Sequence, residues 1–439
     1  MRSILALAPL LVLAACNSSS SPPVAPTPVT PPPPVDTTTP DAQVAPEPAS
    51  TIADPGRSAI EAAHPTAVAI DRTNVDLYAK LASRPGNLIY SPASIETALA
   101  MAAAGAKGPT LAEMQKTLHL PADPQQAAND FSSLLASWAQ SSPEAPALSV
   151  ANHVWIQNGY PIVPAYLSVT RDKYFAPAES IDFLAADAAA KTINGWVAKN
   201  THDKITELVQ AQMLSNVRLV ITNAVYFRGN WQTQFDKSMT TDGDFTTDGG
   251  AKVKAKLMNK GMSVPYADLP NAQIVDLPYK STPTRELVFT VVLPKAGTSL
   301  SALEQSFKAD SIDTWTKGQH WGEVIVTIPK FKTSFSTSLS KDLVAMGMPT
   351  AFSDKADFTG IATAKEGLHI SEVVHKAMIE VDETGTEAAA ATAVMAAGGG
   401  PPPANPPTFK ADHPFLFFLR DKTTGAVLFA GRIVDPTKT

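Results

Sequence analysis

Cysteine is almost absent from this chain of 439 residues, which contains a single one, Cys16. A disulfide within the molecule is therefore excluded, even if the chain leaves the cytoplasm. Hydrophobic residues make up 44% of the sequence. Packing of a hydrophobic core must consequently supply the stability of the fold.

Positive charge is also sparse. The formal net charge is -6, and no Lys or Arg occurs between Thr117 and Thr170. A protein that binds a polyanion needs clustered positive charge to displace counterions. We therefore expect neither nucleic acid nor a heparin-like polyanion as a partner.

Common catalytic motifs are missing as well. The sequence has no Gly-x-Ser-x-Gly elbow, no His-Glu-x-x-His helix and no phosphate-binding glycine loop, and its eight histidines show no metal-ligand spacing. We expect no cofactor and no metal.

One remote enzymatic alternative remains. The stretch from Ser338 to Lys341 matches the Ser-x-x-Lys pattern of β-lactamases and penicillin-binding enzymes, and 422–425 resembles their Lys-Thr-Gly element. In those enzymes the serine normally opens a helix far upstream. We therefore expect the chain not to be an enzyme.

The N-terminus has the composition of an export signal. After Arg2, the apolar run from Ile4 to Ala15 is too short to span a bilayer. Residues 13–16, Leu-Ala-Ala-Cys, resemble a bacterial lipobox, which implies removal of residues 1–15 and acylation of Cys16. We expect an exported lipoprotein, either anchored to the cell envelope (the outer membrane or the cell surface) or extracellular.

The next segment cannot form a core. Residues 17–55 are rich in Pro, Thr and Ala and contain no aromatic side chain, a composition that favours extended polyproline conformers. We interpret residues 16–59 as the lipidated cysteine and a disordered tether. Residues 60–439 are then expected to form one large domain.

Helical and strand patterns alternate along this domain. Ser91 is a plausible N-cap with Pro92 at the first helical position, and 188–197 also has helical character. Strand-like runs are 219–227, 287–293, 324–328, 373–381, 415–419 and 426–429. The last two are almost wholly apolar, so we expect a hairpin buried on both faces in an α+β fold.

The segment after Gly385 is the most informative one. At period 2, the even positions from Thr386 to Ala396 are small or apolar, and the one charge, Glu387, falls on the odd face. Such a segment can form a strand between two existing strands. Local propensity alone favours a short helix with Thr386 as N-cap and Gly398 as terminator, so both interpretations stand at this level.

Four blocks of sequence resemble one protein family. They are 375–434, which contains this segment, then 87–95, 105–108 and 223–231. These blocks, and their order along the chain, resemble those of the serpins, the serine protease inhibitors. The resemblance implies the serpin fold: about nine helices around three mainly antiparallel or mixed β-sheets, with an exposed reactive-centre loop at about 383–407.

The resemblance also implies a mechanism, suicide-substrate trapping. A target protease cleaves the exposed loop and forms an acyl-enzyme, and the freed loop then enters the main sheet as an extra strand before water releases the protease. The starting fold is then metastable, and the expected partner is a serine or cysteine protease, bound by a monomer. The implied hinge residues are Glu383, Gly385, Thr386, Glu387, Ala388, Ala389, Ala390 and Ala391.

Further residues take implied roles by position in the family pattern. Ser91, Ser94, Asn223 and His375 would form a polar cluster beneath the sheet that opens, and Trp231 would lie at the breach where the loop enters. Family spacing forward from Glu383 places the reactive bond at Gly399–Gly400, and spacing back from Phe409 places it at Gly400–Pro401. Because proline after the bond resists most proteases, we expect Gly399–Gly400, or a bond one to three residues earlier.

The sequence around this bond indicates the target class. Small side chains suit the shallow specificity pockets of elastase-like or subtilisin-like proteases and disfavour trypsin-like ones. The alternative is a serpin-fold binding protein without inhibitory activity, although such relatives commonly carry bulky, charged or proline residues in the hinge.

Overall fold

The computed structural model describes residues 5–14, 56–139, 146–281, 285–364, 367–386 and 405–439, with only the backbone described for 5–14 and 56–64. Within these residues the α-helices are α1 Gly56–Leu81, α2 Pro92–Ala103, α3 Gly108–Thr117, α4 Pro124–Trp138, α5 Pro164–Tyr174, α6 Ala186–Asn200, α7 Leu300–Gln305, α8 Ser311–Lys317 and α9 Ser340–Met346. Short 3-10 helices cover Ala211–Leu214, Lys237–Met239 and Thr350–Phe352.

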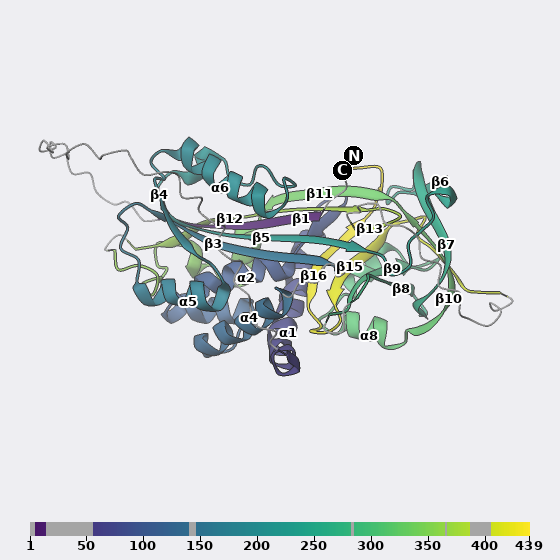
Figure 1. Cartoon of the computed structure of the whole chain (residues 1–439), viewed down its shortest axis with the longest axis horizontal. Helices are drawn as coiled ribbons and strands as arrows, with labels where there is room; N and C mark the ends of the chain where they lie inside the picture. Colours follow the sequence, from purple (N-terminus) through teal and green to yellow (C-terminus); the bar gives the residue numbers. More distant parts are fainter. Residues whose placement is uncertain (1–4, 15–55, 140–145, 282–284, 365–366, 387–404) are drawn as a thin grey trace, which may run out of the picture.

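A seven-stranded sheet runs through the middle of the molecule (Figure 1). Its strands are β1 Leu5–Ala14, β3 Ala147–Gln157, β4 Ala178–Ile181, β5 Val217–Asn230, β11 Phe331–Ser338, β12 His369–Val381 and β13 Gly385–Thr386. All pairings in it are antiparallel except that of β3 with β4. We call it the main sheet.

A second sheet of nine strands packs at one end of the molecule. Its strands are β2 Leu88–Tyr90, β6 Thr241–Thr246, β7 Lys252–Asp268, β8 Ala272–Pro278, β9 Leu287–Pro294, β10 His320–Pro329, β14 Thr408–Lys410, β15 Phe415–Asp421 and β16 Val427–Ile433. The long strand β7 pairs with β6 and β10 along most of its length and with β8 at its end. Two of the three expected sheets are thus joined through β7, and the expected α+β fold class is confirmed.

Local sequence explains the central elements. Ser91 caps α2 by accepting a hydrogen bond from the backbone N–H of Ser94, and Pro92 takes the first helical position, as predicted. Every residue of α2 is buried. Every residue of β15 and β16 is also buried, which confirms the predicted hairpin.

Helices cover both faces of the main sheet. The helices α1, α2, α4 and α5 lie on one face and α6 on the other (Figure 1). The first face belongs to a large hydrophobic core shared with the second sheet. The smaller core under α6 includes Ile193 and Val197 of the helix against Val220, Tyr226 and Val374 of the sheet.

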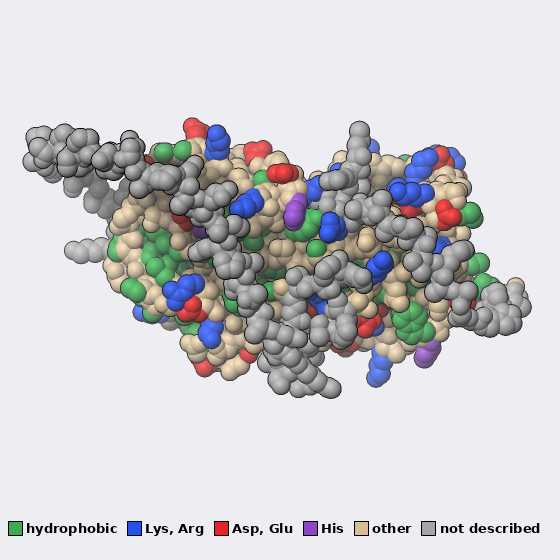
Figure 2. All heavy atoms as spheres, viewed as in Figure 1, with side chains coloured by type: hydrophobic (Ala, Val, Ile, Leu, Met, Phe, Trp, Pro, Cys, Tyr) green, Lys and Arg blue, Asp and Glu red, His purple; other side chains and the backbone are tan. Residues whose placement is uncertain are grey.

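The charges on the surface are mixed. On the face shown in Figure 2, blue and red side chains are interspersed among tan and green ones. Ion pairs within 4 Å, such as Lys254 with Asp244 and Lys256 with Asp242, neutralise lysines on β7. No helix among the described residues is long and apolar enough to cross a bilayer.

The N-terminal residues have a position that their composition did not predict. Residues 5–14, expected as part of a removed leader, form β1 inside the main sheet, between β5 and β12. The folded domain was expected from residue 60, whereas α1 begins at Gly56. The expected tether falls largely on residues 15–55, outside the described part of the chain.

Candidate functional site

The start of the expected loop already belongs to the main sheet. After β12, the chain turns at Asp382, and Gly385–Thr386 form the short strand β13. Thr386 pairs with Val381 of β12 on one side and with Gly229 of β5 on the other. At this residue the strand interpretation holds, and the remaining residues, 387–396, lie outside the described residues.

Gly385 is required by its surroundings. Its φ is 151°, which L side chains rarely adopt, and an added Cβ would lie 2.0 Å from the carbonyl oxygen of Gly229. The turn before it is fixed by Asp382, whose carboxylate accepts hydrogen bonds from the backbone N–H and the hydroxyl of Thr384 at 2.8 and 2.6 Å. Because residue 385 is a glycine, the chain can pair with β5 directly after the turn.

The side chain of Thr386 bonds to a buried tyrosine that belongs to an aromatic stack. Its hydroxyl shares a 2.7 Å hydrogen bond with the hydroxyl of Tyr279, and both residues are fully buried. The ring of Tyr279 stacks on Trp231 with centroids 4.6 Å apart. The Trp231 indole N–H donates to the carbonyl oxygen of Asp382 at 2.9 Å. The expected breach tryptophan therefore contacts the turn that leads into the hinge.

An ion pair fixes Glu383 in the turn between β12 and β13. Glu383 is almost completely buried, and its carboxylate accepts hydrogen bonds from Lys330 at 2.7 Å and from the hydroxyl of Thr240 at 2.8 Å. Burial alone would raise the pKa of Glu383, but these hydrogen bonds outweigh it and lower the pKa. The sequence analysis named Glu383 and missed both partners, because they are more than 50 residues away.

The four residues of the expected polar cluster meet beneath the main sheet. The backbone N–H of Ser91 donates to Nε2 of His375 on β12 at 3.2 Å, and the hydroxyl of Ser94 donates to Oδ1 of Asn223 on β5. All four are buried. The helix α2 thus holds both strands that flank the position of β1 and β13.

The network extends further than the sequence indicated. The amide of Asn223 donates to Oδ1 of Asn152 on β3 at 2.5 Å, and the amide of Asn152 donates to the carbonyl oxygen of Tyr174 at 2.7 Å. The available signal was an asparagine in a strand-like run that ends in the apolar residues 154–156, since an amide buried in a strand needs partners. Asn152 is therefore a further member of the cluster.

His375 is neutral in this setting. It is fully buried, and burial lowers the pKa of its imidazole to about 3. Because Nε2 accepts from Ser91, the neutral ring carries its proton on Nδ1, and within the described residues Nδ1 has no partner. Protonating Nε2 would place two donors face to face.

The remaining predicted site residues lie outside the described residues. These are Cys16, Glu387, Ala388, Ala389, Ala390, Ala391, Gly399 and Gly400.

The Ser-x-x-Lys match does not assemble a catalytic site. Ser338 ends β11, and its hydroxyl donates to the carboxylate of Glu372, so it does not open a helix. Residues 422–425 lie in the turn of the β15–β16 hairpin in the other sheet. Among the described residues, no group of three His, Cys, Asp or Glu side chains is arranged to hold a metal.

Comparisons with known proteins agree with this geometry. The family model for the serpins, the serine protease inhibitors, matches residues 69–436. The chain therefore belongs to the serpin family.

Individual relatives are similar over most of their length. An uncharacterized serpin-like protein of Thermococcus kodakarensis is 38% identical over 374 residues, covering 85% of this chain and 86% of that protein. The leukocyte elastase inhibitor of Bos taurus is 36% identical over 378 residues, covering 83% and 98%. The structure of cleaved Serpin 42Da, at 32% identity, has a TM-score of 0.76 and covers 85% of this chain and 99% of that one.

Proposed function

We propose that this serpin inhibits a serine protease by suicide-substrate trapping, with insertion of the cleaved reactive loop into the main sheet. One observation carries the proposal: Thr386 already pairs with both β5 and β12, and Gly385 pairs with β5, at the start of a strand position between them. A freed loop would continue this strand between β5 and β12, the position that residues 5–14 occupy in this structure. The backbone bonds and the burial of its even-numbered face would supply the driving force.

The hinge sequence supports the same mechanism. Between Thr386 and Val394 the chain has Glu387, on the odd face, and otherwise only alanines and a threonine, and proline first occurs at Pro401. Every residue before Pro401 therefore keeps a backbone N–H for the ladder. At about 3.3 Å per residue, roughly 15 residues span about 50 Å, which is enough to carry a protease to the far end of the sheet.

We further propose an elastase-like or subtilisin-like target. The residues around Gly399–Gly400 are small, which suits a shallow specificity pocket, and one similar protein is named a leukocyte elastase inhibitor. Glycine itself gives the pocket little to hold, so Val394 and Met395 would supply much of the affinity.

We also propose a cellular location on the basis of the N-terminal sequence. Cleavage before Cys16 and acylation of that residue would anchor the chain to the cell envelope, and the proline-rich segment up to residue 55 would hold the domain away from the membrane. Metabolic labelling with an alkyne fatty acid tests this, with Cys16→Ala as the unlabelled control. Equal labelling of both forms would contradict the proposal.

The inhibitory mechanism is tested by mixing the domain with elastase, subtilisin and trypsin, followed by denaturing gels and mass spectrometry. We expect a covalent complex with elastase or subtilisin and a released C-terminal peptide that starts near Gly400. Cleavage of the loop with no complex for any protease would contradict trapping. That result would favour the alternative, a serpin-fold binding protein without inhibitory activity.

A further inference from the structure

The strand β1 occupies the position next to β13 in the main sheet. Ala6 pairs with Met378 of β12, and the ladder continues to Ala14 opposite His369. On the other side, Leu5 pairs with Phe227 of β5, and that ladder continues to Ala14 opposite Val217. Residues 5–14 therefore separate β5 from β12 over most of their length.

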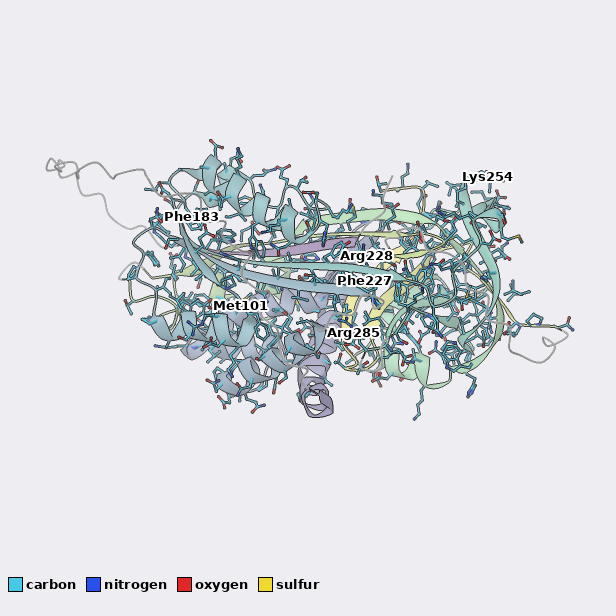
Figure 3. All side chains as sticks on the ribbon, in the orientation of Figure 1. Met101, Phe183, Phe227, Arg228, Lys254 and Arg285 are labelled. Atoms are coloured by element: carbon cyan, nitrogen blue, oxygen red, sulfur yellow. The ribbon has the colours of Figure 1, made fainter. Side chains whose placement is uncertain are left out.

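Both inserted segments lie in one strand position, one after the other. On β12, Ile379 and Glu380 lie between the partner of Ala6 and the partner of Thr386. On β5 only Arg228 lies between Phe227 and Gly229. Figure 3 shows Phe227 and Arg228 next to each other along this strand.

The loop and the N-terminal segment would compete for the same neighbours. If β13 continued in register, Ala388 would face Phe227 and Ala389 would face Met378. Leu5 and Ala6 hold those places, and β1 runs antiparallel to both neighbours, as the loop would. One strand position holds one strand, so insertion beyond Thr386 requires β1 to leave.

The N-terminal segment fits this position less completely than the loop would. Pro9 has no backbone N–H, and proline is unfavourable inside a sheet. Accordingly, pairs with β5 run through Leu5–Leu7 and resume at Leu10. The loop has no proline before Pro401. The segment therefore suits a removable occupant better than a permanent strand.

We propose that residues 5–14, in chains that retain them, occupy the acceptor position of the reactive loop and keep the protein unable to trap a protease until they are removed. The proposal rests on the proposed trapping function for its consequence. Its structural part, the pairing of β1 with β5 and β12, is independent of that function. Removal of the N-terminal segment would then activate the inhibitor.

A cysteine pair tests the pairing directly. The backbone N–H and carbonyl of Val373 bond to Ser340 and Leu339, so they face away from β1. Leu11 and Val373 are thus a pair without mutual hydrogen bonds, in which Cβ atoms approach most closely. In full-length Cys16→Ala protein, which keeps the segment and has no other cysteine, Leu11→Cys with Val373→Cys should form a disulfide with oxidised glutathione.

The control pair is Leu11→Cys with Ile379→Cys, six residues further along β12 and about 20 Å away. It should stay reduced under the same conditions. If both pairs oxidise equally, or neither does, residues 5–14 do not occupy this position and the proposal is overturned.

The functional part compares the full-length Cys16→Ala protein with a chain starting at residue 17. We expect the shorter form to trap elastase or subtilisin and the longer form to be cleaved with at least tenfold less complex. The variant Leu7→Pro with Leu11→Pro, which removes two backbone donors of β1, should restore trapping in the longer form. Equal trapping by the two forms would overturn the proposal that residues 5–14 prevent trapping.

Failure of the proposed function is recognised separately. If neither form traps any of the proteases, a synthetic peptide of residues 386–397 serves as the probe, with uptake measured by native mass spectrometry. Uptake by the shorter form and not by the disulfide-linked longer form supports occupation of the acceptor position. Uptake by both forms, or by neither, overturns it.

Discussion

Substituting Thr386→Arg should convert the inhibitor into a substrate. Thr386 has no solvent exposure, and its hydroxyl bonds to Tyr279, which is also fully buried. An arginine in register would bring a guanidinium next to the Trp231–Tyr279 stack, whose polar atoms bond, among the described residues, to the carbonyl oxygen of Asp382 and to the hydroxyl of Thr386. Burying such a charge without a partner costs about 3 kcal/mol or more.

That cost sets the size of the effect, because the arginine would leave the sheet before cleavage and would have to be buried when the loop inserts. Since 1.4 kcal/mol is a factor of ten in rate, about 3 kcal/mol slows insertion about 100-fold. If insertion is about ten times faster than hydrolysis of the acyl-enzyme in the original protein, insertion in the variant becomes about ten times slower than that hydrolysis. The first cleavage of the loop should keep its rate, because the substitution is 13 residues from the expected reactive bond.

The assay is the number of inhibitor molecules consumed per protease inactivated, measured by titration against elastase or subtilisin. The matched control is Glu387→Arg, which adds the same side chain on the odd face, where alternation predicts exposure. Thr386→Arg should raise the number about tenfold or more, and the control should leave it near its original value. An unchanged covalent complex for Thr386→Arg, or an equal loss for both variants, would refute this reasoning.

Two further predictions concern the hinge ion pair and the buried histidine. Glu383→Lys should lower the free energy of unfolding in urea by about 2 kcal/mol, because it places two ammonium groups together while Lys330 remains partly exposed. The double variant with Lys330→Glu should recover most of this free energy. Equal stability of all three forms would contradict the role of the ion pair. His375 has a folded pKa of about 3 against an ordinary 6.5, so the unfolded chain binds the extra proton, and stability present above pH 6.5 should be lost as the pH falls toward 3, by about 5 kcal/mol in total. His375→Gln, whose amide oxygen still accepts from Ser91, should remove this part of the acid dependence of urea unfolding, and an unaltered pH profile would show that His375 does not carry it.

Much of the fold could be predicted from local sequence. Ser91 and Pro92 define the start of α2 because capping and fixed φ act within a single turn. The buried hairpin could be predicted because both arms are apolar at every position. The strand character of Gly385–Thr386 required more, since local propensity favoured a helix, and pairing with β5 and β12 decided between the two at these residues.

The parts that could not be predicted depend on distant partners. Glu383 is an ordinary surface residue in the sequence until Lys330 and Thr240 come within hydrogen-bond distance. Asn152 belongs to the polar network only because β3 lies beside β5. For residues 5–14, composition predicts an export signal, and nothing local to the run predicts a place in a sheet, because that place is created by strands more than 200 residues away.

The polar cluster distinguishes a filled acceptor position from an empty one. The helix α2 binds β12 through Ser91 and β5 through Ser94, two residues fixed one turn apart. If the inserted strand left and the gap closed, β5 and β12 would approach by about 4.8 Å, one strand spacing. Hydrogen bonds tolerate changes of only about 0.5 Å, so His375 or Asn223 must change partner. The network therefore favours the sheet with a strand between β5 and β12, whether residues 5–14 or the reactive loop supply it.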